Sequence, residues 1–167
     1  MEYNCLSKKG FLSPKDVAEL KTLPTEERLK KGPVAIIECI EDIPCNPCEA
    51  SCKFGAIKIG EDITTCPEFD EEKCTGCGVC VYGCPGLAIF MIDASREGNM
   101  GSVSFPYEFL PLPAAGQIVD VVNRAGEVIC KGTVEKVLAP KISDNTPVVQ
   151  VQVPKDLLME ARGMKLL

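Results

Sequence analysis

The chain has 167 residues with eleven cysteines, no histidine and a formal net charge of −6. The lack of histidine excludes a Rieske-type centre, a His-ligated haem and a His general base, and the acidic balance argues against a nucleic-acid partner. No run approaches the roughly 20 apolar residues of a membrane span and no secretory signal is evident, so we expect a cytoplasmic chain with reduced thiols.

Residues 1–33 predict an N-terminal helical arm. Ser13 is a helix N-cap followed by Pro14 at the first helical position. A second short helix begins near Thr25 and ends before Gly32-Pro33. These elements are too small to form a core, so we expect the arm to pack on the next domain or on a partner subunit.

Residues 34–93 contain an internal repeat with an offset of 32 positions. Each half reads as a strand, a loop that carries cysteines, a short helix and a second strand. Apolar runs over 34–37 and 88–92 bracket the segment, and Ile57-Lys58-Ile59 alternates as a strand does. Two such halves predict a domain with pseudo-twofold symmetry.

Residues 94–102 read as a linker because they are small and polar. Beyond the linker, strands are expected over 103–105, 117–122, 127–138 and 148–153. Residues 103–167 therefore predict a small, separate β-barrel or sandwich domain, closed by a terminal helix over 154–163. The fold class expected for the whole chain is α+β.

The cysteines carry the chemistry. From Cys74 to Pro85 the sequence reads C-x2-C-x2-C-x3-C-P, a pattern typical of iron–sulfur ligation in which the fourth cysteine serves a second cluster. The chain supplies a second motif upstream, from Cys39 to Cys52. Three thiols on one tight loop cannot surround a cubane cluster, so its fourth ligand must come from elsewhere. We therefore expect the last cysteine of each half to bind the cluster of the other half. Cluster A then takes Cys39, Cys45, Cys48 and Cys84, and cluster B takes Cys52, Cys74, Cys77 and Cys80.

The first motif departs from the pattern in two places. Five residues separate Cys39 from Cys45, and Lys53 stands where proline is expected after Cys52. The rivals to Cys39 as fourth ligand of cluster A are Cys66 or a cluster lacking one iron. Cys5, Cys66 and Cys130 are expected to be small buried hydrophobic residues, as free cysteines usually are.

Together, Cys39–Lys53 and Cys74–Pro85 resemble the bacterial-type dicluster [4Fe–4S] ferredoxin domain, over about residues 34–93. The resemblance implies a ferredoxin-like (βαβ)2 fold and two [4Fe–4S] clusters close enough for direct electron tunnelling. The wider layout resembles, less specifically, the small iron–sulfur subunits of FAD-dependent amino-acid dehydrogenases and oxidases, such as those acting on proline or opines. This implies a hetero-oligomer in which an FAD-containing subunit carries the substrate site.

We therefore expect an electron-transfer subunit that passes single electrons between a flavoprotein dehydrogenase and another acceptor. The chain is not expected to be an enzyme by itself, because it has no dinucleotide fingerprint or P-loop and no evident acid–base pair, and hence no catalytic residues. The alternatives are a free-standing soluble ferredoxin, a subunit of a hydrogenase or 2-oxoacid oxidoreductase, and a non-redox iron–sulfur module.

The charge is concentrated on the cysteine segment. Residues 34–98 carry twelve acidic and four basic side chains, a net charge of −8. This surface suits docking to a basic protein face, or is simply solvated. The same charge favours the oxidised form of a cluster and lowers its potential, which Lys53 opposes locally at Cys52.

We predict that Lys53→Glu lowers the reduction potential of cluster B more than that of cluster A, because the charge reversal lies next to a ligand of cluster B. Potentiometry of the two clusters in wild type and variant measures both shifts. Equal shifts would reject the assignment of Cys52 to cluster B.

Overall fold

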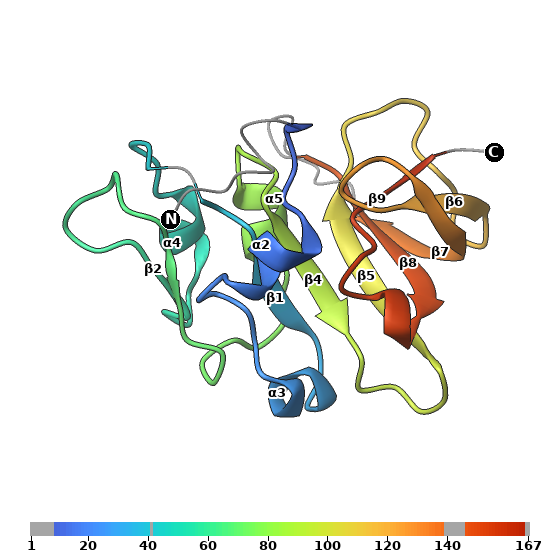
Figure 1. Ribbon diagram of the computed structural model, residues 1–167, viewed down its shortest axis with the longest axis horizontal. Helices are drawn as coiled ribbons and strands as arrows, with labels where there is room; N and C mark the ends of the chain where they lie inside the picture. Colours follow the sequence, from blue (N-terminus) through green and yellow to red (C-terminus); the bar gives the residue numbers. More distant parts are fainter. Residues whose placement is uncertain (1–8, 41, 139–145, 166–167) are drawn as a thin grey trace.

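The computed structural model describes residues 9–40, 42–138 and 146–165 (Figure 1). Seven strands form one antiparallel sheet in the order β1-β4-β5-β8-β7-β6-β9, and β2 pairs with β3. The mixed helix and sheet content agrees with the expected α+β class at this level. Among the described residues, no helix has the length and apolar composition needed to span a bilayer.

The N-terminal arm folds as its caps predict. In α2 (Pro14–Ala18) the Ser13 hydroxyl accepts from the Asp16 amide at 3.3 Å, and the Asp16 carboxylate accepts from the Ser13 amide at 2.8 Å. Thr25 caps α3 (Glu26–Lys30) by accepting from the Arg28 amide. Between the two helices, buried Thr22 donates to the carbonyl of Ile37 at 2.5 Å, so the arm lies against the cysteine segment.

The two halves of the repeat follow the same element order. The first half contains β1 (Val34–Ile37), α4 (Pro47–Ser51) and β2 (Ile57–Lys58). The second contains β3 (Glu68–Phe69), α5 (Val79–Gly83) and β4 (Ile89–Asp93). The outer strands of the two halves pair with each other, with Val34 opposite Ile92, and so do the inner strands. Each half is therefore completed by the other.

The C-terminal strands continue the same sheet, which differs from the expected separate domain. β5 (Met100–Pro106) pairs directly with β4, with Asp93 opposite Ser102. The segment expected as a linker over 94–102 is therefore the connection of a hairpin and the start of β5. Small polar residues suit a tight connection as well as a linker, so composition alone did not separate the two cases.

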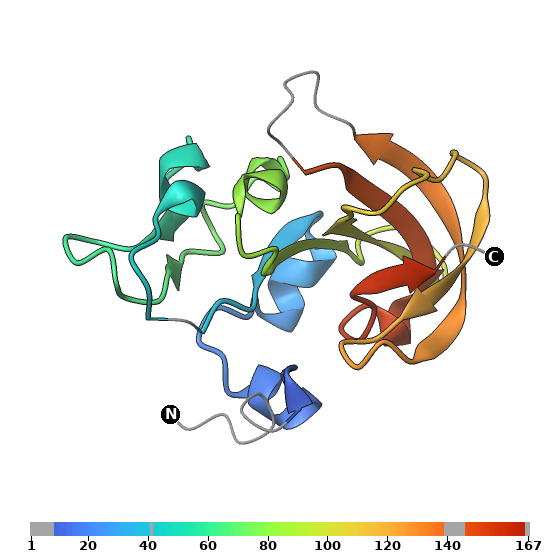
Figure 2. The ribbon, with the colours of Figure 1, turned by 90° about the horizontal axis from the view of Figure 1, so that it is seen from above.

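Three further strands lie close to their expected positions: β6 (Ile118–Val122), β7 (Val128–Leu138) and β8 (Val148–Pro154). Figure 2 shows how this sheet curls. Its buried core cluster includes several valines and Phe105. The expected terminal helix over 154–163 was wrong. Only a 3-10 turn, Lys155–Leu157, forms there, and β9 (Gly163–Lys165) then pairs with β6. The exposed backbone groups of β6 gain a partner in this way, which overrides local helix propensity.

We predict that Gly132→Ala in β7 lowers the free energy of unfolding by about 1–3 kcal/mol through overpacking. An added Cβ would lie 2.5 Å from Val151 Cγ1 and 2.7 Å from Val121 Cγ2. Denaturant unfolding measures the change. The neighbouring exposed substitution Thr133→Ala serves as control, with an expected change within about 0.5 kcal/mol. Equal stability of the two variants would contradict the packing around Gly132.

Candidate iron–sulfur centres

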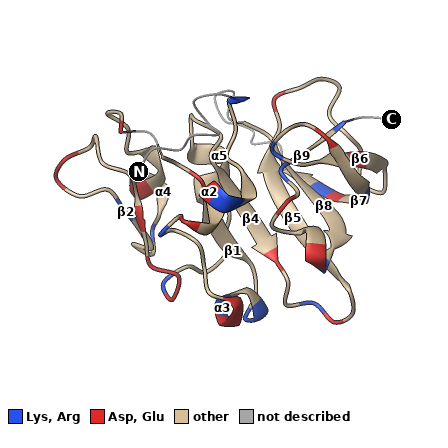
Figure 3. Ribbon diagram, in the orientation of Figure 1, with Lys and Arg blue, Asp and Glu red and all other residues tan. Residues whose placement is uncertain are grey.

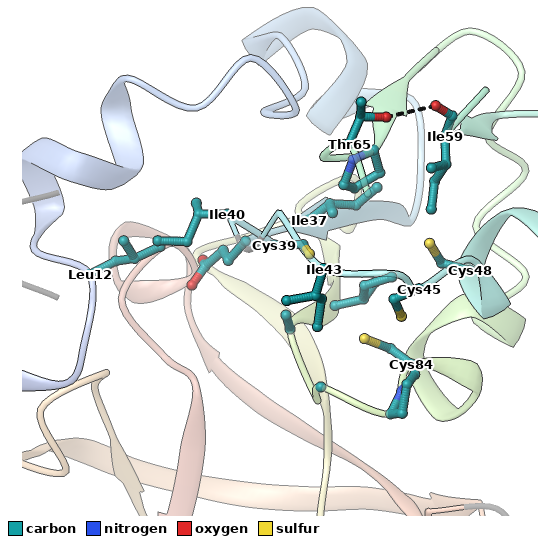
Figure 4. Close-up of a pocket in the computed structure, with 16 residues that line it drawn as sticks. Leu12, Ile37, Cys39, Ile40, Ile43, Cys45, Cys48, Ile59, Thr65 and Cys84 are labelled. Atoms are coloured by element: carbon teal, nitrogen blue, oxygen red, sulfur yellow. Dashed lines mark hydrogen bonds between the residues drawn. The ribbon is translucent and has the colours of Figure 1, made fainter. Parts of the chain in front are cut away.

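Eight of the cysteines gather around two cavities. Figure 4 shows four thiols around the first, three from the first motif and one from the second. These are Cys39, Cys45, Cys48 and Cys84. This cavity has a volume of about 410 Å³. Its other walls are mostly apolar and include Ile37, Ile59 and Ile89. Such a donor set, four soft thiols in an apolar enclosure, fits an iron–sulfur cluster.

The second cavity is lined by the other four thiols of the two motifs, namely Cys52, Cys74, Cys77 and Cys80. Its volume is about 20 Å³, room for about one water molecule. The donor set, four thiols on the loops of both motifs, fits the same kind of cluster. Cys77 is the exposed thiol of the four, so its loop is the wall that meets solvent.

The ends of α4 and α5 explain how one motif serves both cavities. Cys48 and Cys80 lie inside the two helices, whereas Cys52 and Cys84 are their C-cap residues. The chain leaves the helical conformation at each C-cap, where ψ is 89° at Cys52 and 111° at Cys84. Each C-cap thiol lines the cavity of the other half.

Burial controls the protonation of the deepest thiols. It raises the pKa of Cys48 to about 11, and the neighbouring thiols Cys84, Cys39 and Cys45 add to the shift. Burial likewise raises the pKa of Cys80 to about 12, with further contributions from Cys74, Cys77 and Cys52. The thiols that repel one another are those that share a cavity. Metal ligation requires thiolates, so binding at either group releases protons.

The position of Cys39 addresses the ambiguity left by the widened first motif. Cys39 lines the first cavity with the other three thiols, and Cys66 does not. The Cys66 thiol instead donates to the Asp42 carboxylate at 3.5 Å. Ile43, within the widened segment, lines the same cavity and is 52% exposed. The geometry favours Cys39 over Cys66 as the fourth donor.

The remaining cysteines lie apart from both cavities or outside the description. Cys130 is partly buried against the core of the curled sheet, and this burial raises its pKa. Cys5 lies outside the described residues. Within the described ranges, no three His, Cys, Asp or Glu side chains converge as ligands of one metal ion would. The thiols of the two groups surround volumes instead.

A buried ion network next to Cys39 was not expected from the sequence. Glu38 accepts from Arg124 Nε at 2.9 Å and from Arg162 Nε at 2.8 Å. Burial alone raises the pKa of Glu38, but the hydrogen bond from Arg124 and the two guanidinium charges lower it overall. Burial lowers the pKa of Arg162 to about 10, and its Cζ lies 4.8 Å from the Phe90 ring centroid. The network joins the β6–β7 turn and the C-terminal segment to the first cavity.

A second unexpected residue, Arg28 of α3, lies beside the other cavity. Its guanidinium donates to the carbonyl of Cys74 at 2.6 Å. Neither Arg28 nor Glu38 belongs to a motif. The sequence held only a weak sign of the Glu38 network, namely a single charged residue, Glu38, directly after the apolar run of β1.

Comparison with known proteins locates the iron–sulfur signal. Residues 67–90 match the family described as a 4Fe-4S binding domain, a span that includes Cys74, Cys77, Cys80 and Cys84. The chain therefore contains a 4Fe–4S binding domain. No solved structure matches the chain.

Curated relatives match different lengths of the chain. ABC transporter E family member 1 of Arabidopsis thaliana is 33% identical over 125 residues, covering 65% of this chain and 20% of the relative. A component of the Na(+)-translocating ferredoxin:NAD(+) oxidoreductase complex of Acetobacterium woodii is 46% identical over 50 residues, 30% of this chain and 14% of the relative. A component of the ion-translocating oxidoreductase complex of Methanosarcina acetivorans is 49% identical over 47 residues, 28% of this chain and 17% of the relative. The chain spans about a fifth or less of the length of these relatives.

We predict that Gly76→Ala prevents Cys52, Cys74, Cys77 and Cys80 from gathering around one cluster. The matched substitution Gly78→Ala is expected to be tolerated. Both glycines have positive φ, +70° and +78°, so each variant carries a similar left-handed strain of about 1–2 kcal/mol. Only at Gly76 would the Cβ collide, at 2.4 Å from the carbonyl oxygen of Pro33. Iron analysis is expected to show about half the wild-type iron in Gly76→Ala. Similar losses in both variants would contradict this packing.

Proposed function

We propose that the chain is an electron-transfer iron–sulfur subunit that holds two [4Fe–4S] clusters. It passes single electrons between another acceptor and an FAD-containing dehydrogenase that oxidises an amino acid. The observation that carries the proposal is the sorting of eight thiols into two groups of four around separate cavities. Each group takes three thiols from one motif and one from the other, the arrangement that two cubanes sharing a domain require.

When bound, each cluster supplies one-electron redox chemistry. The chain's own residues hold and insulate it. The eight thiolates serve as ligands, and the apolar walls that include Ile37 and Ile57 exclude water. The amide of Ala56 donates to the Cys52 sulfur at 3.3 Å, which stabilises negative charge on that ligand.

The surface around the cavities suits docking to a basic protein face. Figure 3 shows Asp and Glu along the loops that surround α4 and β2. The connection from β2 to β3 contains Glu61 and Asp62, both exposed, and Glu68 of β3 is exposed as well. A partner with a complementary basic face would be steered toward this part of the molecule.

A complex, rather than a free carrier, is favoured by the segments that flank the repeat. The arm and the strands β5 to β9 are packed parts of the molecule that supply none of the eight thiols. Two relatives named as subunits of oxidoreductase complexes are 46% and 49% identical to the chain over 50 and 47 residues. The proposed partner is a flavoprotein subunit that carries the substrate site, and the chain alone has no catalytic role.

Single-cysteine variants test the two-cluster proposal. We predict about eight irons per chain and two one-electron couples in wild type. Cys84→Ala is expected to remove the couple assigned to cluster A although Cys84 belongs to the motif of cluster B, and Cys52→Ala to do the reverse. Anaerobic iron analysis and EPR-monitored potentiometry measure these outcomes.

Cys130→Ala is the matched control, because Cys130 lines neither cavity, and both couples are expected to survive in it. If Cys84→Ala instead removes the couple that Cys77→Ala removes, the exchange of ligands is wrong. The partner is tested by anaerobic affinity purification from the native host with flavin analysis. A low-mass peak alone in size exclusion of the extract would argue for a free-standing ferredoxin.

A second candidate is an iron–sulfur module without a redox role. It is favoured by the match to ABC transporter E family member 1, which extends over 125 residues. That match is longer than those to the two relatives from oxidoreductase complexes. The two candidates differ in one property, because only the electron carrier has clusters that are reduced and reoxidised reversibly at accessible potentials.

A further inference from the structure

We propose that Arg28 is a positioning residue for the second thiol group, and that its fixed positive charge raises the reduction potential of the cluster bound there. Arg28 lies on α3 of the N-terminal arm, outside both cysteine motifs. The inference rests on the proposed function, since it requires that Cys52, Cys74, Cys77 and Cys80 bind a redox-active cluster. It adds to the four ligands a residue that holds their loop and shifts the reduction potential of the cluster.

The Arg28 guanidinium holds the loop that enters the second cavity. Nη2 donates to the carbonyls of Cys74 at 2.6 Å and Pro33 at 3.1 Å. Nε donates to the carbonyl of Glu71 at 2.9 Å, and Nη1 to that of Gly32 at 3.1 Å. The residue is only 6% exposed. One planar fork therefore fixes both the start of the motif and the end of the arm.

Other contacts keep α3 in place over the same loop. The Thr25 amide and hydroxyl donate to the Glu71 carboxylate at 2.5 and 2.9 Å. Lys31 Nζ lies 3.2 Å from Glu72 Oε1. The carbonyl of Pro33, which accepts from Arg28, also occupies the space beside Gly76. Arg28 thus belongs to a packed contact and is not a side chain that swings in solvent.

The charge of Arg28 differs in setting from the arginines near the first cavity. A guanidinium stays protonated in proteins. All four acceptors of Arg28 given above are backbone carbonyls, and the salt bridges found within the described residues do not include it. Arg124 and Arg162, by contrast, surround the carboxylate of Glu38. The second cavity therefore lies beside a buried cation without a bonded carboxylate.

This difference gives the effect its direction. Reduction adds one electron and thus one negative charge to a cluster, with no bond formed or broken. A buried positive charge stabilises that added charge more than an exposed one does, since solvent screens it less. Arg28 therefore favours the reduced state at the second group and has a smaller effect at the first.

The test compares charge and fork separately. Arg28→Gln removes the charge, Arg28→Lys keeps the charge but loses the planar fork, and Lys31→Gln removes an exposed charge from the same short arm. Both clusters are reduced with dithionite as electron donor and followed by EPR-monitored potentiometry. In Arg28→Gln we expect the reduction equilibrium of cluster B to fall at least tenfold, 59 mV for a one-electron couple, with a smaller change at cluster A. Lys31→Gln is expected to shift neither cluster by that amount.

Arg28→Lys is expected to change the reduction equilibrium of cluster B by less than tenfold, because the charge is kept. It is expected to speed amide hydrogen exchange at Cys74 and Gly76, because the planar fork is lost. If Arg28→Gln fails to retain cluster B, loss of about half the iron with cluster A intact supports the positioning role. A tenfold fall in Arg28→Lys, or equal shifts of both clusters in Arg28→Gln, overturns the inference while two wild-type couples still support the proposed function. A wild-type chain without two reversible couples overturns both.

Discussion

The pairing of β1 with β4 is the interaction on which both thiol groups depend. The two strands come from different halves of the repeat, and every residue of β1 is fully buried in this ladder. Cys39 follows β1 and Cys84 precedes β4, so the pairing brings thiols that are 45 positions apart to one cavity. The adjacent helices then turn their C-cap thiols across the pseudo-symmetric boundary. Neither cavity is completed by the residues of one half alone.

The cysteine segment was largely predictable from the sequence because its constraints are local. Spacing fixes which thiols share a loop, and the repeat identifies the loops that must exchange a ligand. The caps at Ser13 and Thr25 and the β-rich runs after residue 100 are local signals of the same kind. The two groups of four expected from the motifs line the two cavities found, while their role as ligands stays a prediction.

The remainder depended on contacts between distant residues. A small polar stretch at 94–102 is compatible with a linker or a hairpin, and only the pairing of Asp93 with Ser102 distinguishes them. The segment after Pro154 has helix-forming residues, yet its backbone completes the edge of β6. Arg28 and Arg162 find their partners 46 and 124 positions away. No periodicity or motif in a single sequence encodes such pairs.

The ion network around Glu38 has a consequence for the order in which the molecule is assembled during synthesis. The Glu38 side chain is only 7% exposed and lies next to Cys39, and an isolated buried carboxylate costs several kcal/mol. Arg162 is made 124 residues later. Until that part of the chain has been made, Glu38 lacks one of its two guanidinium partners. The complete network beside Cys39 can therefore form only after all eight motif cysteines have been made.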